Sequence, residues 1–136
     1  MCAGRTICAV SRRSIDAVLA EAQAQLHRLT AQEAAAAVHD GAVLIDTRDA
    51  DARTRDGSIP GAIHAPLTVL EWRVDPSSGF QDEALAGRED RIILICREGY
   101  SSSLAAVRLQ ELGFANTTDV IGGFAAWREA GLPIER

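Results

Sequence analysis

The sequence lacks the features that mark several large classes of protein. It has no apolar run near the ~20 residues that a membrane-spanning helix requires. It has no excess of positive charge, because 14 Lys and Arg stand against 19 Asp and Glu, a net charge of −5, whereas a nucleic-acid-binding domain normally carries a basic face. We therefore expect neither a membrane nor a nucleic acid as a partner. A molecule of this charge must capture an anionic substrate through local positive groups.

Cysteine and histidine are too few and too scattered for a disulfide framework or a metal site. Cysteine occurs three times, an odd number, and Cys2 and Cys8 lie near the N-terminus, where we expect disordered thiols. The three histidines show no metal-ligand spacing. Residues 1–13 are expected to be flexible, and they lack the apolar core of a secretory signal. We therefore expect a cytoplasmic protein with no metal and no cofactor.

What the sequence does contain is an alternation of strand and helix patterns within one domain of 136 residues. The clearest strand is residues 92–95, an unbroken apolar run that is typical of a central parallel strand buried on both faces. Further short strands are predicted at 43–46, just before Pro66, and at 118–121. Capping residues and helical spacing predict helices over residues 14–28, 30–40, 49–57, 67–74, 102–112 and 124–130. The N-caps of the first three are expected to be Ser14, Thr30 and Asp49. The predicted fold class is α/β, a mainly parallel sheet flanked by helices.

Two of the predicted helices carry further expectations. The N-terminal helix, assigned to residues 14–29, precedes the main domain of residues 30–136 and can either pack on its body or mediate dimerisation. The chain is accordingly expected to be a monomer or a homodimer. The helix at 102–112 has its apolar positions at Leu104, Val107, Leu109 and Leu112.

The segment after the clearest strand carries the residues of greatest chemical interest. Cys96 stands at the carboxyl end of that strand, where open parallel sheets place their sites, and just before a helix N-terminus with its free N–H groups and positive dipole end. Gly99 gives the loop the freedom to curl its amides into an anion-binding nest. Such surroundings favour the thiolate and would also stabilise an anionic persulfide. The alternative is a small buried apolar cysteine. Arg91 and Arg97 are the nearby positive candidates, although Arg97 can instead pair with Glu98.

A thiolate held by amides suits two chemistries. In sulfur transfer, the thiolate attacks an outer sulfur, expels sulfite or a thiol, and passes the bound sulfur on. Phosphate-ester or arsenate chemistry usually needs a guanidinium to clamp the equatorial oxygens. The sixth residue after Cys96 is Ser102, so the chain has no Cys-x5-Arg pattern. This absence and the short loop favour sulfur over phosphate.

Four ordered segments resemble the rhodanese family, and together they span about residues 30–134. The segments are Leu44–Arg48, Gly57–His64, Ile92–Ser103, and Gly122–Trp127 with Gly131–Pro133. The resemblance implies a three-layer fold with a central mainly parallel sheet. It also implies a sulfurtransferase that forms a persulfide on Cys96, with thiosulfate or a persulfide as donor and cyanide or a thiol as acceptor.

The same resemblance assigns roles to the other residues of the loop and its surroundings. The residues expected to cradle the substrate through backbone amides are Arg97, Glu98, Gly99, Tyr100 and Ser101, and Ser102 is expected to open the helix. The residues themselves indicate supporting structural roles for three others: Asp46 can cap the turn after its strand, Arg48 is expected to pair with a nearby acid, and His64 is expected to be a structural histidine. Tyr100 is expected to face outward. Trp127 is expected in the core, and Trp72 either at the mouth of the pocket or under a loop.

The sequence departs from the family at two places and leaves two other functions open. Many relatives carry an arginine near the end of the loop, where this chain has Ser101 and Ser102, and Ser58 stands where histidine is usual. The donor preference is therefore open. One alternative is a non-enzymatic module that relays sulfur or binds a partner through the same loop. The other is a cysteine phosphatase or arsenate reductase.

Overall fold

A parallel four-stranded sheet forms the centre of the computed structural model, which describes residues 12–136. The strands lie side by side in the order β2 (Ile63–His64), β1 (Val43–Asp46), β3 (Ile92–Ile95) and β4 (Thr117–Asp119). β1 and β3, the two central strands, are buried along their whole length. The strands predicted at 43–46 and 92–95 are confirmed with these bounds, because an unbroken apolar run suits a strand covered on both faces.

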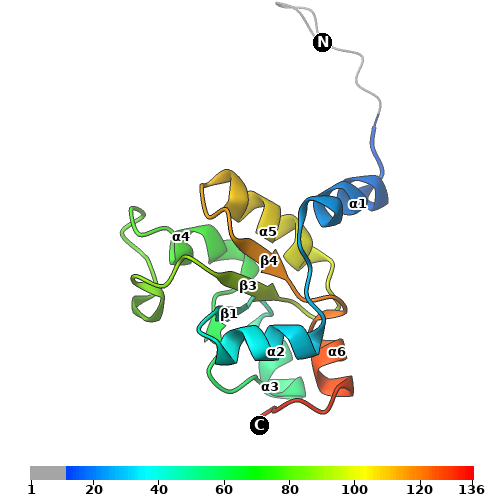
Figure 1. The fold of residues 1–136 in the computed structure, drawn as a ribbon, viewed down its shortest axis with the longest axis vertical. Coiled ribbons are helices and arrows are strands. Elements are labelled where there is room, and N and C mark those ends of the chain that lie inside the picture. Colours follow the sequence, from blue (N-terminus) through cyan, green and yellow to red (C-terminus); the bar gives the residue numbers. More distant parts are fainter. Residues whose placement is uncertain (1–11) are drawn as a thin grey trace, which may run out of the picture.

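Helices cover both faces of the sheet and make the fold three-layered, as the resemblance implied (Figure 1). The helices are α1 (Ile15–Gln25), α2 (Ala31–His39), α3 (Ala50–Asp56), α4 (Leu70–Val74), α5 (Ser101–Glu111) and α6 (Gly123–Glu129), with 3-10 turns at Leu67–Val69 and Glu83–Leu85. Val43 and Ile45 of β1 pack with α4 and α5. Leu44, between them, packs with α2 and α6. This alternation places one apolar core on each side of the sheet.

The N-terminal helix packs on the body of its own chain, against α5 (Figure 1). Ser14 caps it as predicted, but the helix ends at Gln25 rather than near Arg28. The residues after it run beside β4, where the Leu29 N–H donates to Asp119 O (3.1 Å) and the Ile121 N–H donates to Leu29 O (2.8 Å). The prediction of a longer helix was wrong because pairing with β4 satisfies this backbone better than a further helical turn.

The face that α5 buries differs from the one that its large apolar residues suggest. The buried positions are Ser102, Ser103, Ala105, Ala106 and Leu109. Leu112 is 49% exposed, and Leu104 and Val107 are half-buried, in a hollow between α5 and α1. Small residues let α5 approach the sheet closely. Two of its three serines, Ser102 and Ser103, are buried because they have a polar partner, described below.

The helices of residues 12–136 include none with the length and apolar character to span a bilayer.

Candidate active site

Cys96 lies at the carboxyl end of β3, at the start of a tight loop that leads into α5. Its side chain is buried, with 6% of the residue exposed. The first turn of α6 holds the loop from behind, because the Phe124 N–H donates to Cys96 O (2.7 Å) and the Ala125 N–H donates to Arg97 O (3.0 Å). Gly123 permits this approach: its φ is +58°, and a Cβ there would lie 2.5 Å from Cys96 O.

These anchors determine which way the loop amides face. The C=O and N–H of a trans peptide point in opposite directions. Binding the carbonyls of Cys96 and Arg97 to α6 therefore turns the N–H groups of Arg97 and Glu98 to the other side of the loop. The Gly99 N–H donates directly to Cys96 Sγ, over 3.1 Å. Gly99 has a φ of +86°, which suits glycine and lets the chain curl around the sulfur.

Ser102 provides the second polar contact to the sulfur. Its Oγ lies 3.1 Å from Cys96 Sγ and 2.8 Å from Asp119 Oδ2. The Ser103 hydroxyl also donates to Asp119 Oδ2 (2.7 Å), and Arg28 binds both oxygens of this buried carboxylate at 2.8 and 3.2 Å. In the thiol form, Cys96 donates to Ser102 and Ser102 donates to Asp119. In the thiolate form, the Ser102 proton can turn to the sulfur, because Asp119 keeps its bonds to Ser103 and Arg28.

The surroundings of Cys96 lower its pKa. Burial raises the pKa of the Cys96 thiol, but several hydrogen bonds outweigh this effect and bring it below its usual value. These come from the hydroxyl and backbone of Ser102, the Ser101 hydroxyl and the Gly99 N–H. The reactive thiolate therefore persists at pH values below the ordinary thiol pKa, and it is lost as the pH falls through the lowered value.

Replacing Ser102 tests this account of the thiolate. We expect Ser102→Ala to raise the pH midpoint for alkylation of Cys96 and to slow alkylation near neutral pH by about three- to tenfold, since one pH unit corresponds to a factor of about ten. Alkylation at high pH should be unchanged. Ser103→Ala is the matched control, because Ser103 bonds Asp119 without bonding the sulfur. Equal shifts in the two variants would show that the contact to the sulfur has no effect of its own.

A cleft of about 390 Å³ opens beside Cys96 and is lined by several positive groups. Its walls include Arg48, Arg55 and Arg97, and Ser101 lies beside the cysteine. Among the described residues that line it, the only carboxylate is that of Asp49, whose Oδ1 accepts the Ala52 N–H (2.7 Å) as the cap of α3. The whole chain is acidic, but the arginines of this cleft can bind an anion. It is the kind of local positive site that a chain with a net negative charge needs in order to bind an anionic substrate.

Asp46 and His64 lie behind the cleft and hold Arg48 in place. The Arg48 guanidinium donates to both oxygens of Asp46 (3.1 and 2.8 Å) and to Gly57 O (2.8 Å), and it lies 3.7 Å from the centre of the Phe124 ring. His64 Nε2 lies 2.6 Å from Arg48 O. Arg48 therefore pairs with a nearby acid, as expected, and also forms part of the cleft wall.

The structure also shows where the remaining predicted residues lie. Tyr100 is 61% exposed, and Glu98 is exposed, and neither lines the cleft. Within the described part of the chain, Arg97 forms no ion pair, so the alternative pairing with Glu98 is not observed. Arg91 was wrongly expected near Cys96, because it precedes β3 at the opposite end of the strand, close to Asp40. Trp127 is in the core, as predicted. Trp72 is 54% exposed and lies in a separate hollow with Phe80 rather than at the mouth of the cleft.

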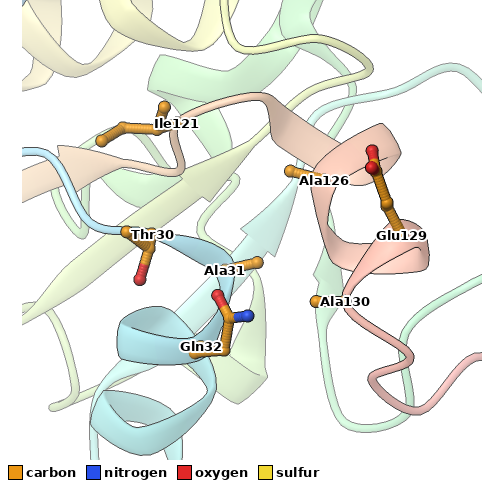
Figure 2. Close-up of a pocket in the computed structure, with 7 residues that line it drawn as sticks. All are labelled: Thr30, Ala31, Gln32, Ile121, Ala126, Glu129 and Ala130. Atoms are coloured by element: carbon orange, nitrogen blue, oxygen red, sulfur yellow. The ribbon is translucent and has the colours of Figure 1, made fainter.

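A second hollow of about 370 Å³ lies between α2 and α6 (Figure 2). Small side chains line most of it, and Glu129 is its one ionisable residue. Among the described residues that line it, the one hydroxyl belongs to Thr30 and caps α2 by accepting the Glu33 N–H (3.1 Å), so the cleft at Cys96 is the candidate active site. Across residues 12–136, no cluster of His, Cys, Asp and Glu could hold a metal ion. Cys2 and Cys8 lie outside the described residues.

Comparison with known proteins agrees with this geometry. The family model described as Rhodanese-like domain matches residues 30–130, well over half of the chain. The chain belongs to the rhodanese-like family. The thiosulfate sulfurtransferase GlpE of Haemophilus influenzae is 36% identical over 107 residues, which cover 79% of this chain and 92% of that protein.

One further relative and one solved structure are also similar to this chain. The adenylyltransferase and sulfurtransferase MOCS3-2 of Zea mays is 34% identical over 102 residues, and the match covers 74% of this rhodanese-like chain but only 20% of the maize protein. A solved structure from Rhodopseudomonas palustris, a protein of unknown function described as a possible tyrosine phosphatase, has a TM-score of 0.82 and 34% identity. It covers 96% of this chain and 100% of its own, so the likeness extends beyond residues 30–130.

Several residues that shape the rhodanese-like site were not predicted. Arg28 and Asp119 are 91 positions apart in the sequence, and no local pattern joins them. Gly123 lay in a segment that resembled the family, but its close approach to Cys96 O could not be inferred from the sequence. An acid within the strand predicted at 118–121 was the available signal for Asp119, since a charged group in a buried strand needs polar partners.

Proposed function

We propose that this protein is an enzyme that transfers sulfane sulfur through a persulfide on Cys96. The donor is a small anion such as thiosulfate, and the acceptor is cyanide or a thiol. The observation that carries the proposal is the environment of Cys96 Sγ, which has the Gly99 N–H and the Ser102 hydroxyl each at 3.1 Å and faces a cleft walled by arginines. A thiolate with a lowered pKa suits a reducing compartment, and we infer a cytoplasmic location.

The proposed reaction has two steps and needs no cofactor. The Cys96 thiolate attacks the outer sulfur of thiosulfate, a new S–S bond forms, and the old S–S bond breaks with its electrons leaving on sulfite. Cyanide or a thiolate then attacks the outer sulfur of the Cys96 persulfide and leaves as thiocyanate or a new persulfide, which restores the thiolate. The donors that hold the thiolate can also hold the persulfide anion, because the negative charge moves outward by only one S–S bond of about 2 Å.

The arginines of the cleft are proposed to capture the donor. Arg97 is exposed and lies beside the reacting cysteine, so we expect Arg97→Gln to raise the KM for thiosulfate several-fold and to leave kcat within about twofold, because the charge acts on binding. The effect should shrink as salt is added. Arg88→Gln, at an exposed arginine outside the cleft lining, is the control in the same steady-state assay. A fall in kcat with an unchanged KM would contradict the assigned role.

Phosphate chemistry fits the site less well. A phosphoryl group in transfer needs positive groups around its equatorial oxygens. At the loop position where a guanidinium would close on it, this chain has Ser102, with the buried carboxylate of Asp119 directly behind. The deciding experiment compares thiocyanate formation from thiosulfate and cyanide with hydrolysis of an aryl phosphate by the same preparation. Sulfur transfer with no hydrolysis is the expected result, and hydrolysis with no sulfur transfer would overturn the proposal.

A further inference from the structure

Arg28 reaches the active-site loop from outside the matched family region, which begins at residue 30. It follows α1, in the segment that runs beside β4, and its side chain is only 16% exposed. Its guanidinium makes three contacts: Nε with Asp119 Oδ1 (2.8 Å), and Nη2 with Asp119 Oδ2 (3.2 Å) and with Gly99 O (2.9 Å). Both groups that it binds belong to the surroundings of Cys96.

We propose that Arg28 is a positioning residue for Cys96, which fixes the loop through the Gly99 carbonyl and fixes Ser102 through Asp119. The proposal rests on the proposed function in taking Cys96 as the reacting group. It gives the segment of residues 14–29 a part in the active site beyond packing on α5.

The first contact acts on the backbone of the loop. Holding the Gly99 carbonyl toward Arg28 turns the Tyr100 N–H, which belongs to the same peptide, to the opposite side. Gln23 of α1 supports this carbonyl, with its Nε2 at 3.4 Å. A Cβ at Gly99 would meet both Gly122 N (2.8 Å) and Arg28 Nη2 (3.2 Å), so these two groups lie on the same side of the loop. The start of α6 and the side chains of the N-terminal segment therefore both pack against the loop at Gly99.

The second contact, between Arg28 and Asp119, compensates a buried negative charge. The Asp119 carboxylate is fully buried and is linked to Cys96 Sγ through one hydroxyl, that of Ser102. An uncompensated negative charge at this place would oppose formation of the thiolate. The fork of Arg28 binds both carboxylate oxygens and supplies the compensating charge. Without it, the partners left to the Asp119 carboxylate in residues 12–136 would be the hydroxyls of Ser102 and Ser103, and the thiolate would form beside an acid with no paired cation.

Other charged groups surround Cys96 and must be kept constant in any test. They come from the end of β1, from α3 and its cap, from the loop itself and from β4, and they are Arg48, Asp49, Arg55, Arg97 and Asp119. None of these is changed by a substitution at Arg28, so a shift in the titration of Cys96 reports on Arg28 and the groups that it holds.

The test measures how alkylation of Cys96 by iodoacetamide depends on pH, with the modified peptide quantified by mass spectrometry. For Arg28→Gln we expect the midpoint to rise by about half to one pH unit, which slows alkylation near neutral pH by about three- to tenfold. The rate at high pH, where every variant is a thiolate, should stay within about twofold of the parent. Arg108→Gln is the control, since this exposed arginine of α5 pairs only with Glu111 among the described residues.

Two results would overturn the proposal. One is a midpoint for Arg28→Gln equal to that of the parent. The other is an equal loss of rate at neutral and high pH, which would mean that the substitution only disturbs the packing. If Arg28→Gln does not fold, Arg28→Lys replaces it. Lysine keeps the charge but not the fork, so a smaller rise in the same direction is expected, and an unchanged midpoint refutes the proposal. Because alkylation needs no sulfur donor, this outcome is independent of whether thiosulfate is the substrate.

Discussion

Cys96→Ser is expected to abolish sulfur transfer from thiosulfate to cyanide, with a loss of at least about a thousandfold in kcat/KM. A serine hydroxyl is not ionised at neutral pH and cannot form a persulfide, so the covalent step is removed rather than slowed. The replacement is close in size, and the contacts from Gly99 and Ser102 can pass to an oxygen. We therefore expect an unchanged fold and a melting temperature close to that of the parent protein.

The other thiols of the chain provide the control for this prediction. A double variant with Cys2→Ser and Cys8→Ser should keep the activity of the parent, because we assign the sulfur-carrying role to Cys96 alone. Thiocyanate formation measures all of these proteins in one assay. Full activity in Cys96→Ser, or its loss in the double variant, would move the reacting group to another cysteine.

Gly123→Ala is expected to destabilise the protein strongly and to impair the site at the same time. A Cβ at this position would lie 2.5 Å from Cys96 O and 2.8 Å from Arg97 C. The left-handed backbone with a φ of +58° costs about 1–2 kcal/mol for a residue with a side chain, and the overlap adds about 1–3 kcal/mol. We expect the free energy of unfolding to fall by about 2–5 kcal/mol and sulfur transfer to fall about tenfold or more, because the loop must move away from α6.

Gly131→Ala is the matched control for this substitution. Gly131 has a φ of +74°, but a Cβ there would meet nothing within 4 Å. It therefore shares the cost of the left-handed backbone, about 1–2 kcal/mol, and lacks the overlap with the loop. Urea denaturation of the two variants separates the effects. Equal losses of stability, with sulfur transfer intact in both, would show that the approach of α6 to Cys96 does not support the loop.

The sequence predicted best those parts of the fold that short-range physics determines. The strands at residues 43–46 and 92–95 were correct because unbroken apolar runs need cover on both faces. The caps at Ser14, Thr30 and Asp49 were correct because a cap binds an N–H only a few residues away. The position of Cys96 at the end of a central strand followed from the same local patterns.

The errors arose where distant segments meet. The N-terminal helix ended early because its last predicted residues pair with β4, some 90 positions along the chain. Of the apolar positions predicted for α5, Leu109 is buried but Leu112 is exposed. Ser102 and Ser103 take part in the buried face because Asp119 binds their hydroxyls. The sequence did not indicate a role for Arg28, because only the folded chain places its guanidinium next to Gly99 O. The position of Cys96 in the fold could thus be predicted, whereas the groups from distant segments that surround it could not.

The most direct test of the account is the mass of the Cys96 peptide after the protein has been mixed with thiosulfate and digested without reductant. The account predicts one additional sulfur atom on this peptide, removed when cyanide is added and absent from the Cys96→Ser protein. No added sulfur, or sulfur on the peptides of Cys2 or Cys8 instead, would contradict it.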